Sequence, residues 1–436
     1  MSRTREFAHV GVSVHPDRSF AVVVHGSAVV PVEPARADVD GTIASAVRAA
    51  IGQFPGGPFA VTVDIAPMLL DAVTRPDSAL PHVAVVRVVP RPATDPALGR
   101  SPAALIERRV ARRFTVAGGH DLLGNELCPL DRGQLAEVCA ELAGGPIRHV
   151  AIVAAGSQAR PGHERDVADA IQAAVPGARI SAASEYGGHG LVAREATVVL
   201  DCALAVVTDQ LIDRCERVLS RLPGEFHLRV ARGDGGYATP SRIRTMPVVA
   251  FGATDALEVC GAAYLAGLAD CRVVLSRDGT QLAGEVRRGL AQVSLAESAG
   301  IGTELVVPTA VLAPERDLTP NGVPGRMTDV PVVRARHEPE LLACVGAAIS
   351  SPTSWLDEVA FIESAEELES VRRDAAARAT AFVTANGAAP GTAFLTEVST
   401  VAVPYSPSGT VRIRVRVAGA PDVGLIQTGK PARESR

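Results

Sequence analysis

Short valine-rich runs alternate with amphipathic helical stretches through the middle of the chain. The apolar run RHVAIVAAG (148–156) precedes the helical stretch HERDVADAIQAAV (163–175), and ARISAAS (178–184) precedes a long apolar helix over about 193–221. A strand that is buried on both faces reads as a continuous apolar run and needs helices to cover it. The alternation therefore predicts an α/β fold with a covered, largely parallel or mixed sheet.

The length of 436 residues favours two or three domains over a single one. We expect an N-terminal domain over 1–145, a core domain over 146–330 and a small C-terminal α+β region over 331–436. The C-terminal region follows a proline-rich stretch and carries one long charged helix, with Gly387 as its stop signal, and then two strands. Its polar end is expected to be a disordered tail.

Two local assignments rest on shorter patterns. The stretch SPAALIERRVARRF (101–114) predicts a helix with an arginine-rich face, with Ser101 as its N-cap and Pro102 in its first turn. The run PVVAFGA (247–253) predicts a strand.

Composition argues against several function classes. The net charge is −5 and arginine is not concentrated on one predicted face, so no nucleic-acid partner is expected. The single lysine, Lys430, lies in the polar C-terminal stretch, which excludes a catalytic lysine or a lysine-bearing phosphate loop in the folded body. The seven cysteines are scattered without Cys-x-x-Cys spacing, so neither a disulfide framework nor a structural metal site is expected.

The chain start lacks the apolar core of a signal peptide. The longest uncharged run, 341–356, is short for a bilayer and is broken by Ser351 and Pro352. No membrane segment is therefore expected, and the predicted location is the cytoplasm.

Two segments have the pattern of a β-hairpin with small residues at its tip. The stretch CRVVLSRDGTQLAGEV (271–286) reads as strand, tight turn and strand, and HVGVSVHPDRSFAVVV (9–24) repeats this pattern near the start of the chain. Backbone N–H groups that converge at such a tip bind phosphate, and glycine lets the anion approach. A plain structural hairpin has the same pattern, so both interpretations stay open at this point.

Several longer segments resemble the hydantoinase A/oxoprolinase family. They include GNELCPLDRGQLAEVCAELAGGPIRHVAIV, GHGLVAREATVVLDCALA, VARGDGGYATPSRIRTMPVVAFGATDALEVCGAAYLAGL and TEVSTVAVPYSPSGTVRIRVRVAG. The resemblance runs from about 120 to 290 and returns over 378–420; its better markers are PGHER, the Asp-Gly-Gly at 234–236 and GAAYLAGL.

The resemblance implies a duplicated actin-like ATPase architecture, which is ribonuclease H-like, with two halves that close on ATP. It also implies ATP-coupled opening of a cyclic amide such as a hydantoin or 5-oxoproline, often in a hetero-oligomer. Each half of a family member carries a hairpin of the form Asp-x-Gly-Gly-Thr-x-Thr-Asp, whose carboxylates hold Mg²⁺ while the tip meets the phosphates.

This chain departs from that pattern in both hairpins. Ser13 and Ser276 stand at the leading Asp positions, and Phe20 and Ala283 stand at the closing ones, so all four carboxylates are missing. Pro16 removes a backbone donor from the first tip. Negative charge is added where phosphates would lie, by Asp17 in the first hairpin and Asp278 in the second. We therefore expect neither ATP nor Mg²⁺ as a cofactor, and we expect a relic nucleotide site formed by Ser13, Ser276, Gly279, Thr280, Gly235 and Gly236.

Three polar residues are candidates for catalysis in the old cleft. Glu185 and His189 lie on the glycine-rich loop SEYGGHG after a predicted strand, where α/β proteins present site residues. Asp234 begins the Asp-Gly-Gly turn, which is explained equally well as a tight connection. His163 and Glu164 fit a helix start better than a metal or acid/base role, and Asp201, within an apolar run, must be paired or functional.

The leading hypothesis is a pseudoenzyme, either a structural or a regulatory subunit with a hetero-oligomeric partner. The alternative is an ATP-independent hydrolase that acts on a small amide or lactam through Glu185, His189 and Asp234. A third hypothesis is an ordinary hydrolase of the family that binds ATP at a rearranged site.

Overall fold

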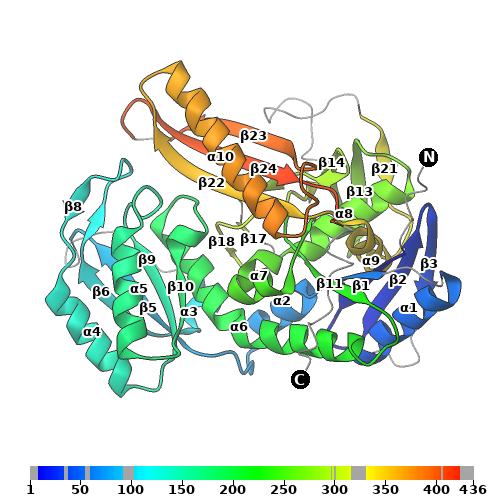
Figure 1. The fold of residues 1–436 in the computed structure, drawn as a ribbon, viewed down its shortest axis with the longest axis horizontal. Helices are drawn as coiled ribbons and strands as arrows, with labels where there is room; N and C mark the ends of the chain where they lie inside the picture. Colours follow the sequence, from blue (N-terminus) through cyan, green and yellow to red (C-terminus); the bar gives the residue numbers. More distant parts are fainter. Residues whose placement is uncertain are drawn as a thin grey trace, which may run out of the picture.

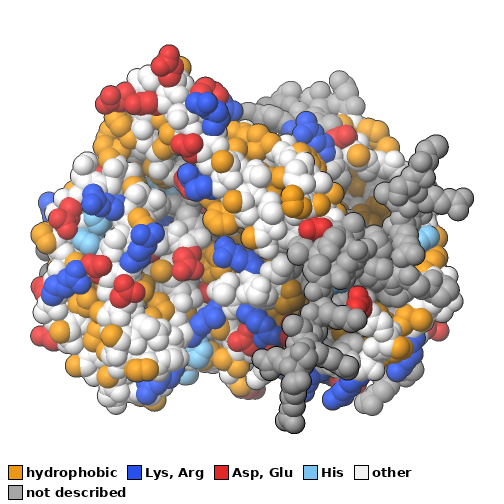
Figure 2. Space-filling view, viewed as in Figure 1, with side chains coloured by type: hydrophobic (Ala, Val, Ile, Leu, Met, Phe, Trp, Pro, Cys, Tyr) orange, Lys and Arg blue, Asp and Glu red, His pale blue; other side chains and the backbone are white. Residues whose placement is uncertain are grey.

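The computed structural model describes residues 8–33, 38–54, 59–91, 103–295, 297–298, 301–315, 330–403 and 406–422. Ser101, Pro102, Lys430 and the predicted tail lie outside these ranges. The predicted mixed α/β class is confirmed, since several sheets are covered by helices (Figure 1). On the face in Figure 2, acidic and basic side chains are interspersed; the expectation of no nucleic-acid partner stays a prediction.

The largest sheet contains the first hairpin. Its strand order is β12-β11-β4-β1-β2-β3, in which β1, β2 and β3 form an antiparallel meander, and β4 and β11 add to β1 in parallel. The Asp38 carboxylate caps helix α1 by accepting a hydrogen bond from the Gly41 N–H at 2.8 Å. The elements are β1 (His9–Val14), β2 (Ser19–His25), β3 (Ala28–Val32), α1 (Val39–Gln53), β4 (Phe59–Asp64), α2 (Ala66–Thr74), β11 (Phe226–Ala231) and β12 (Tyr237–Ala238).

A second, parallel sheet lies between β4 and β11 in the chain. Its order is β10-β9-β5-β6, so it combines strands from both sides of residue 145; the division into domains stays a prediction. The long helix α6 runs from this sheet to α1 (Figure 1). The elements are β5 (Val83–Val89), α3 (Ala104–Glu107), β6 (Val110–Ala117), α4 (Arg132–Gly144), β9 (His149–Ala154), α5 (Gly162–Ala174), β10 (Arg179–Ala182), the 3₁₀ turn η2 (Ala183–Glu185) and α6 (Leu191–Leu219).

The third sheet contains the second hairpin. Its main order is β15-β14-β13-β21, with β13 antiparallel to β14 and parallel to β21, just as β1 is antiparallel to β2 and parallel to β4. Asp278 (φ 48°) and Gly279 (φ 75°) are both left-handed, which is the type I′ turn that two-residue hairpins favour. Both predicted hairpins are therefore present. The elements are α8 (Ala253–Leu265), β13 (Cys271–Arg277), β14 (Thr280–Arg287), β15 (Leu290–Ala291), β21 (Val332–Arg334) and α9 (Pro339–Ile349).

The C-terminal unit is a three-stranded antiparallel sheet covered by one helix, drawn in yellow to red at the top of Figure 1. The hydroxyl of Ser364 caps the helix by accepting from the Glu367 N–H at 3.1 Å, and Gly387 (φ 99°) follows its end as predicted. Its elements are β22 (Thr353–Phe361), α10 (Ala365–Ala385), β23 (Phe394–Ala402) and β24 (Thr410–Ala418).

The remaining short elements connect these sheets. They are α7 (Pro240–Thr245), the 3₁₀ turn η3 (Pro247–Ala250), β7 (Gly119–His120), β8 (Glu126–Cys128), β16 (Val293–Ser294), β17 (Glu297–Ser298), β18 (Thr303–Glu304), β19 (Thr309–Ala310) and β20 (Ala313–Pro314).

Two local predictions were wrong. The described part of the predicted helix over 101–114 is the single turn α3 followed by strand β6, because the residues from 110 onward extend the parallel sheet beside β5. The run 247–253 forms the turn η3 and the start of α8 instead of a strand. There the Val248 N–H donates to the buried carboxylate of Asp201 at 3.1 Å instead of to a neighbouring strand. A short apolar run does not distinguish these outcomes, since only its partners differ.

One helical stretch, 247–265, is long and apolar enough to cross a membrane. Most of it is buried within the fold, and the core helix of a protein that spans no membrane has the same composition.

Glycines allow α8, α9 and β1 to pack in close contact. A Cβ on Gly261 of α8 would lie 2.1 Å from the carbonyl oxygen of Leu342, and one on Gly346 of α9 would lie 2.1 Å from that of Leu257. A Cβ on Gly11 of β1 would lie 1.9 Å from the carbonyl oxygen of Cys344 in α9. Because these neighbours are backbone atoms, a side chain at any of the glycines would push the elements apart.

We expect Gly346→Ala to lower the free energy of unfolding by about 1–3 kcal/mol, because α8 and α9 must separate to admit the methyl group. Denaturant unfolding measures this loss. The matched control is Gly52→Ala in α1, where a Cβ would have no atom within 4 Å, and stability should be unchanged or rise by less than about 1 kcal/mol. Equal effects at the two positions would contradict the close-packing account.

Candidate functional site

One side of the cleft between the hairpins is built around Asp64. The Asp64 carboxylate ends strand β4 beside Ser13 of β1, and it is fully buried. It accepts hydrogen bonds from the Ala66 N–H (3.0 Å), the Thr254 hydroxyl (2.8 Å) and the Ser13 hydroxyl (3.3 Å). Burial raises the pKa of Asp64 to about 6, and these three hydrogen bonds oppose the shift. Sequence reasoning missed Asp64, although a carboxylate that ends an apolar parallel strand is a recognisable signal.

The other side of the cleft is held by Arg277 of the second hairpin. Its guanidinium contacts two carboxylates of α8, at 2.7 Å from Asp255 and 2.7 Å from Glu258. Burial raises the pKa of Glu258 to about 7, against the opposing effect of Arg277. A cavity of about 320 Å³ between the two sides is lined by His15, Thr254, Asp255, Glu258 and Arg277, among others. Among the described residues that line this cavity, Arg277 carries the only guanidinium, and it is paired with Asp255 and Glu258.

The predicted relic residues do not come together around this cavity. Ser13 is buried beneath it. Ser276 is exposed, and its hydroxyl oxygen accepts a hydrogen bond from the Gln281 side-chain amide at 3.1 Å. Gly279 and Thr280 lie at the exposed hairpin tip.

Gly235 and Gly236 belong to the packing around Asp234 instead. A Cβ on Gly236 would lie 2.0 Å from the Thr353 hydroxyl, so glycine is needed where β22 meets this turn. The Asp234 carboxylate is fully buried and accepts from Thr353 (2.9 Å) and Arg232 (3.3 Å). Burial opposes its ionisation, but the charges of Arg232 and Arg416 hold the pKa of Asp234 below its usual value. Asp234 thus joins the C-terminal unit to the body and does not line a described cavity.

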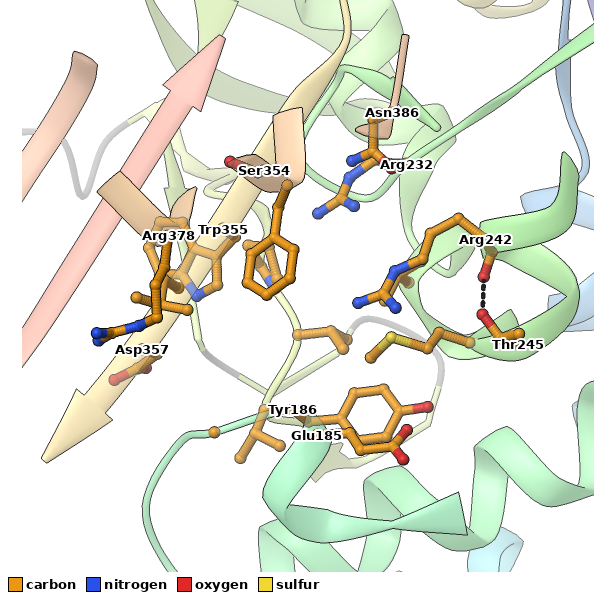
Figure 3. Close-up of a pocket in the computed structure, with 18 of the residues that line it drawn as sticks. Glu185, Tyr186, Arg232, Arg242, Thr245, Ser354, Trp355, Asp357, Arg378 and Asn386 are labelled. Carbon is orange, nitrogen blue, oxygen red and sulfur yellow. Dashed lines mark hydrogen bonds between the residues drawn. The ribbon is translucent and has the colours of Figure 1, made fainter. Parts of the chain in front are cut away.

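A second cavity, of about 580 Å³, lies where the C-terminal unit meets the body. Figure 3 shows Arg232 and Arg242 reaching into it from one side and Glu185 and Tyr186 facing them. Trp355 of β22 forms a further wall. Of the three predicted catalytic residues, only Glu185 lines this cavity.

Glu185 and His189 occupy different surroundings. Glu185 follows β10 and opens to the cavity, where loss of surrounding water, and then the charge of Asp201, raise its pKa. His189 is exposed outside the cavity lining, and partial desolvation and the charge of Arg412 lower its pKa. Sequence reasoning missed Arg232 and Arg242; for Arg232, the Arg-Gly that precedes the Asp-Gly-Gly turn was the available signal.

The remaining buried acids have structural partners. Glu164 accepts from the Ala154 N–H (2.8 Å) and the Ser184 N–H (2.7 Å), which ties the start of α5 to the ends of β9 and β10. Asp201 accepts from the Ser181 hydroxyl (2.6 Å) and the Val248 N–H (3.1 Å). The Glu164 and Asp201 carboxylates therefore join segments of the fold through hydrogen bonds.

His120, Glu126 and His163 form the one described cluster with the spacing of a metal site. However, Nδ1 of His163 accepts a hydrogen bond from the Gly119 N–H at 2.9 Å, which places the ring proton on Nε2. That Nε2–H faces the Glu126 carboxylate at 3.1 Å. A metal ion at Nε2 would need this nitrogen unprotonated, so the geometry fits a hydrogen-bonded pair better than a metal centre.

No protein-family model matches the chain, and no curated protein matches it in sequence. Among solved structures, it is similar to the ATP-dependent caprolactamase from Pseudomonas jessenii, with a TM-score of 0.68 and 11% identity over 94% of this chain and 87% of that chain. It is also similar to nucleotide-free acetone carboxylase, from work on ATP-dependent acetone carboxylation, with a TM-score of 0.51 and 14% identity over 71% of this chain. The match spans about half (48%) of the acetone carboxylase chain. At these identities, the similarity establishes a shared fold.

The cleft carboxylates should make stability depend on pH. The pKa of Asp64 is about 6 in the folded protein against 3.8 for the ordinary side chain, so its stabilising contribution is complete below about pH 4 and is lost as the pH rises through 6. We expect Asp64→Asn to reduce that loss by about 1–3 kcal/mol, because a neutral amide does not ionise. Denaturant unfolding between pH 4 and 7 gives the comparison, with Asp71→Asn on α2 as the control. Parallel curves for parent and Asp64→Asn would contradict the assignment.

Proposed function

We propose that the chain is a degenerate member of the hydantoinase A/oxoprolinase family that no longer runs ATP-dependent cleavage of a cyclic amide. The structural neighbours, both described as ATP-dependent enzymes, support this family, as do the sequence segments that resemble it. The duplicated actin-like architecture is part of the proposal. It is supported by the matching orders β3-β2-β1-β4 and β15-β14-β13-β21.

The observation that carries the proposal is the chemistry of the cleft between the hairpins. The hairpins supply no carboxylate at the positions that would hold Mg²⁺, and Arg277 is already paired with Asp255 and Glu258. An entering triphosphate would therefore meet Asp255 and Glu258, with Asp64 buried behind the lining, and no unpaired cation lies among the described lining residues. Repulsion between like charges a few Å apart costs on the order of several kcal/mol at an effective dielectric near 20, enough to remove useful affinity.

In this proposal the protein acts as a pseudoenzyme in the cytoplasm, as a subunit beside a partner. A surface suited to a partner lies on the edge strand β23, where Phe394 and Leu395 are about half exposed and Val401 is 54% exposed. Apolar side chains grouped on one strand favour contact with another protein over contact with water.

A second function is favoured by the position of Glu185. A carboxylate with a raised pKa in a large cavity suits general-base catalysis, so the cavity could support ATP-independent hydrolysis of a small amide. His189 and Asp234 take no part in this version, since neither lines the cavity.

We expect calorimetric titration with Mg·ATP and Mg·ADP to give no binding up to millimolar nucleotide, because the cleft lacks Mg²⁺ ligands on the hairpins and presents negative charge. The ATP-dependent caprolactamase, titrated in the same buffer, is the positive control. Micromolar binding of Mg·ATP, or nucleotide-dependent opening of a lactam by the pure protein, would refute the proposal. Lactam hydrolysis without nucleotide that disappears in Glu185→Gln would instead establish the second function.

A further inference from the structure

We propose that the 580 Å³ cavity binds a small organic carboxylate with an apolar body, and that Arg232 and Arg242 receive the carboxylate. The proposal concerns a cavity separate from the hairpin cleft, so it does not depend on whether the protein binds nucleotide. It rests on the charge balance of the lining and on the apolar walls of the cavity.

The two arginines give the cavity a positive side. Arg232 is 6% exposed, and its Nε donates a hydrogen bond to the Asp234 carboxylate. That carboxylate also accepts hydrogen bonds from the Thr353 hydroxyl and the Gly236 N–H. Arg242 is half-buried, and within the described ranges its guanidinium has neither a hydrogen bond nor an ion pair. Burial, and then the charge of Arg232, lower the pKa of Arg242. An anion between the two guanidiniums would relieve this repulsion.

The other charged groups of the lining do not supply that anion. The Asp357 carboxylate is engaged by Arg412 in two hydrogen bonds, of 2.7 and 2.6 Å. Glu358 pairs with Arg378 at the rim. Glu185 lies across the cavity beyond ion-pair distance from Arg242 in the described structure, and its negative charge would turn a bound carboxylate toward the arginines.

The cavity walls suit an apolar body. Trp355, Phe382, Met246 and Val249 line it, and the Phe382 ring lies 6.0 Å from the Arg242 guanidinium carbon. The cavity has positive charge on one side and apolar walls on the other, so it suits a carboxylate with an apolar body.

Trp355 also provides the readout, because it is the only tryptophan in the chain. The full-length protein is titrated with phenylacetate and with phenylacetamide, its neutral isostere, while tryptophan fluorescence is recorded. We expect saturable binding of phenylacetate at least about tenfold tighter than that of the amide, since a charged carboxylate accepts stronger hydrogen bonds from a guanidinium than a neutral amide oxygen does. Inorganic phosphate, which lacks an apolar body, should bind at least about tenfold more weakly than phenylacetate.

Variants separate the charge effect from a structural one. Arg242→Gln should weaken phenylacetate binding about tenfold or more and leave phenylacetamide unchanged, whereas Arg242→Lys, which keeps the charge but not the planar guanidinium, should weaken phenylacetate binding less than Arg242→Gln does. The matched control is Arg378→Gln, which removes a lining arginine that is already paired with Glu358 and is 47% exposed. Glu185→Gln should strengthen phenylacetate binding, because it removes the opposing charge.

Three results would overturn the proposal: no saturable signal with phenylacetate, equal affinity for acid and amide, or an affinity that Arg242→Gln leaves unchanged. Equally tight binding of phosphate and phenylacetate would overturn the apolar part. If Arg242→Gln does not fold, the comparison of phenylacetate with phenylacetamide and the effect of Glu185→Gln still decide the question. None of these outcomes bears on the Mg·ATP titration.

Discussion

The close contact of α8, α9 and β1 is the constraint on which the arrangement of the molecule depends. Gly11, Gly261 and Gly346 let three backbones approach to a distance that any side chain would prevent. As a result, α9 packs directly on the first hairpin and α8, while α8 carries Asp255 and Glu258 to Arg277, beside the turn of the second hairpin. The two hairpins therefore face one cleft because the helices behind them are in contact.

Buried charges place the C-terminal unit on this body. Arg416 of β24 reaches the carboxylate and the carbonyl oxygen of Asp234, and it donates to the Ala291 carbonyl oxygen at 2.7 Å. A buried ion must be paired, and Arg416 supplies one of the two guanidiniums beside Asp234, so moving the unit away would break this buried pairing. The large cavity exists because of this attachment, since β22 and α10 form the wall opposite Glu185.

The two cavities differ in how their charges are balanced. In the hairpin cleft, Arg277 is matched by Asp255 and Glu258, and Asp64 is bound by three donors. In the large cavity, Arg242 faces open space with its charge unmatched at ion-pair distance in the described structure. The guanidinium of the hairpin cleft already has acidic partners and would gain little from an anion, whereas Arg242 would gain an ion pair. The charge arrangement thus favours an anionic ligand in the large cavity over one in the hairpin cleft.

Local patterns in the sequence determined the α/β class, both hairpins, the tight turn at Asp278-Gly279 and the glycine stop after α10. Each depends on residues close together in the chain, where propensity, capping and periodicity operate. Only the tertiary structure decided that 110–117 joins a sheet and that the buried Asp234 carboxylate joins the C-terminal unit to the body. It also decided that Glu185 faces Arg232 and Arg242, while His189 does not. These outcomes depend on which distant segments come into contact. The local sequence pattern does not show which residues a side chain contacts from distant parts of the chain.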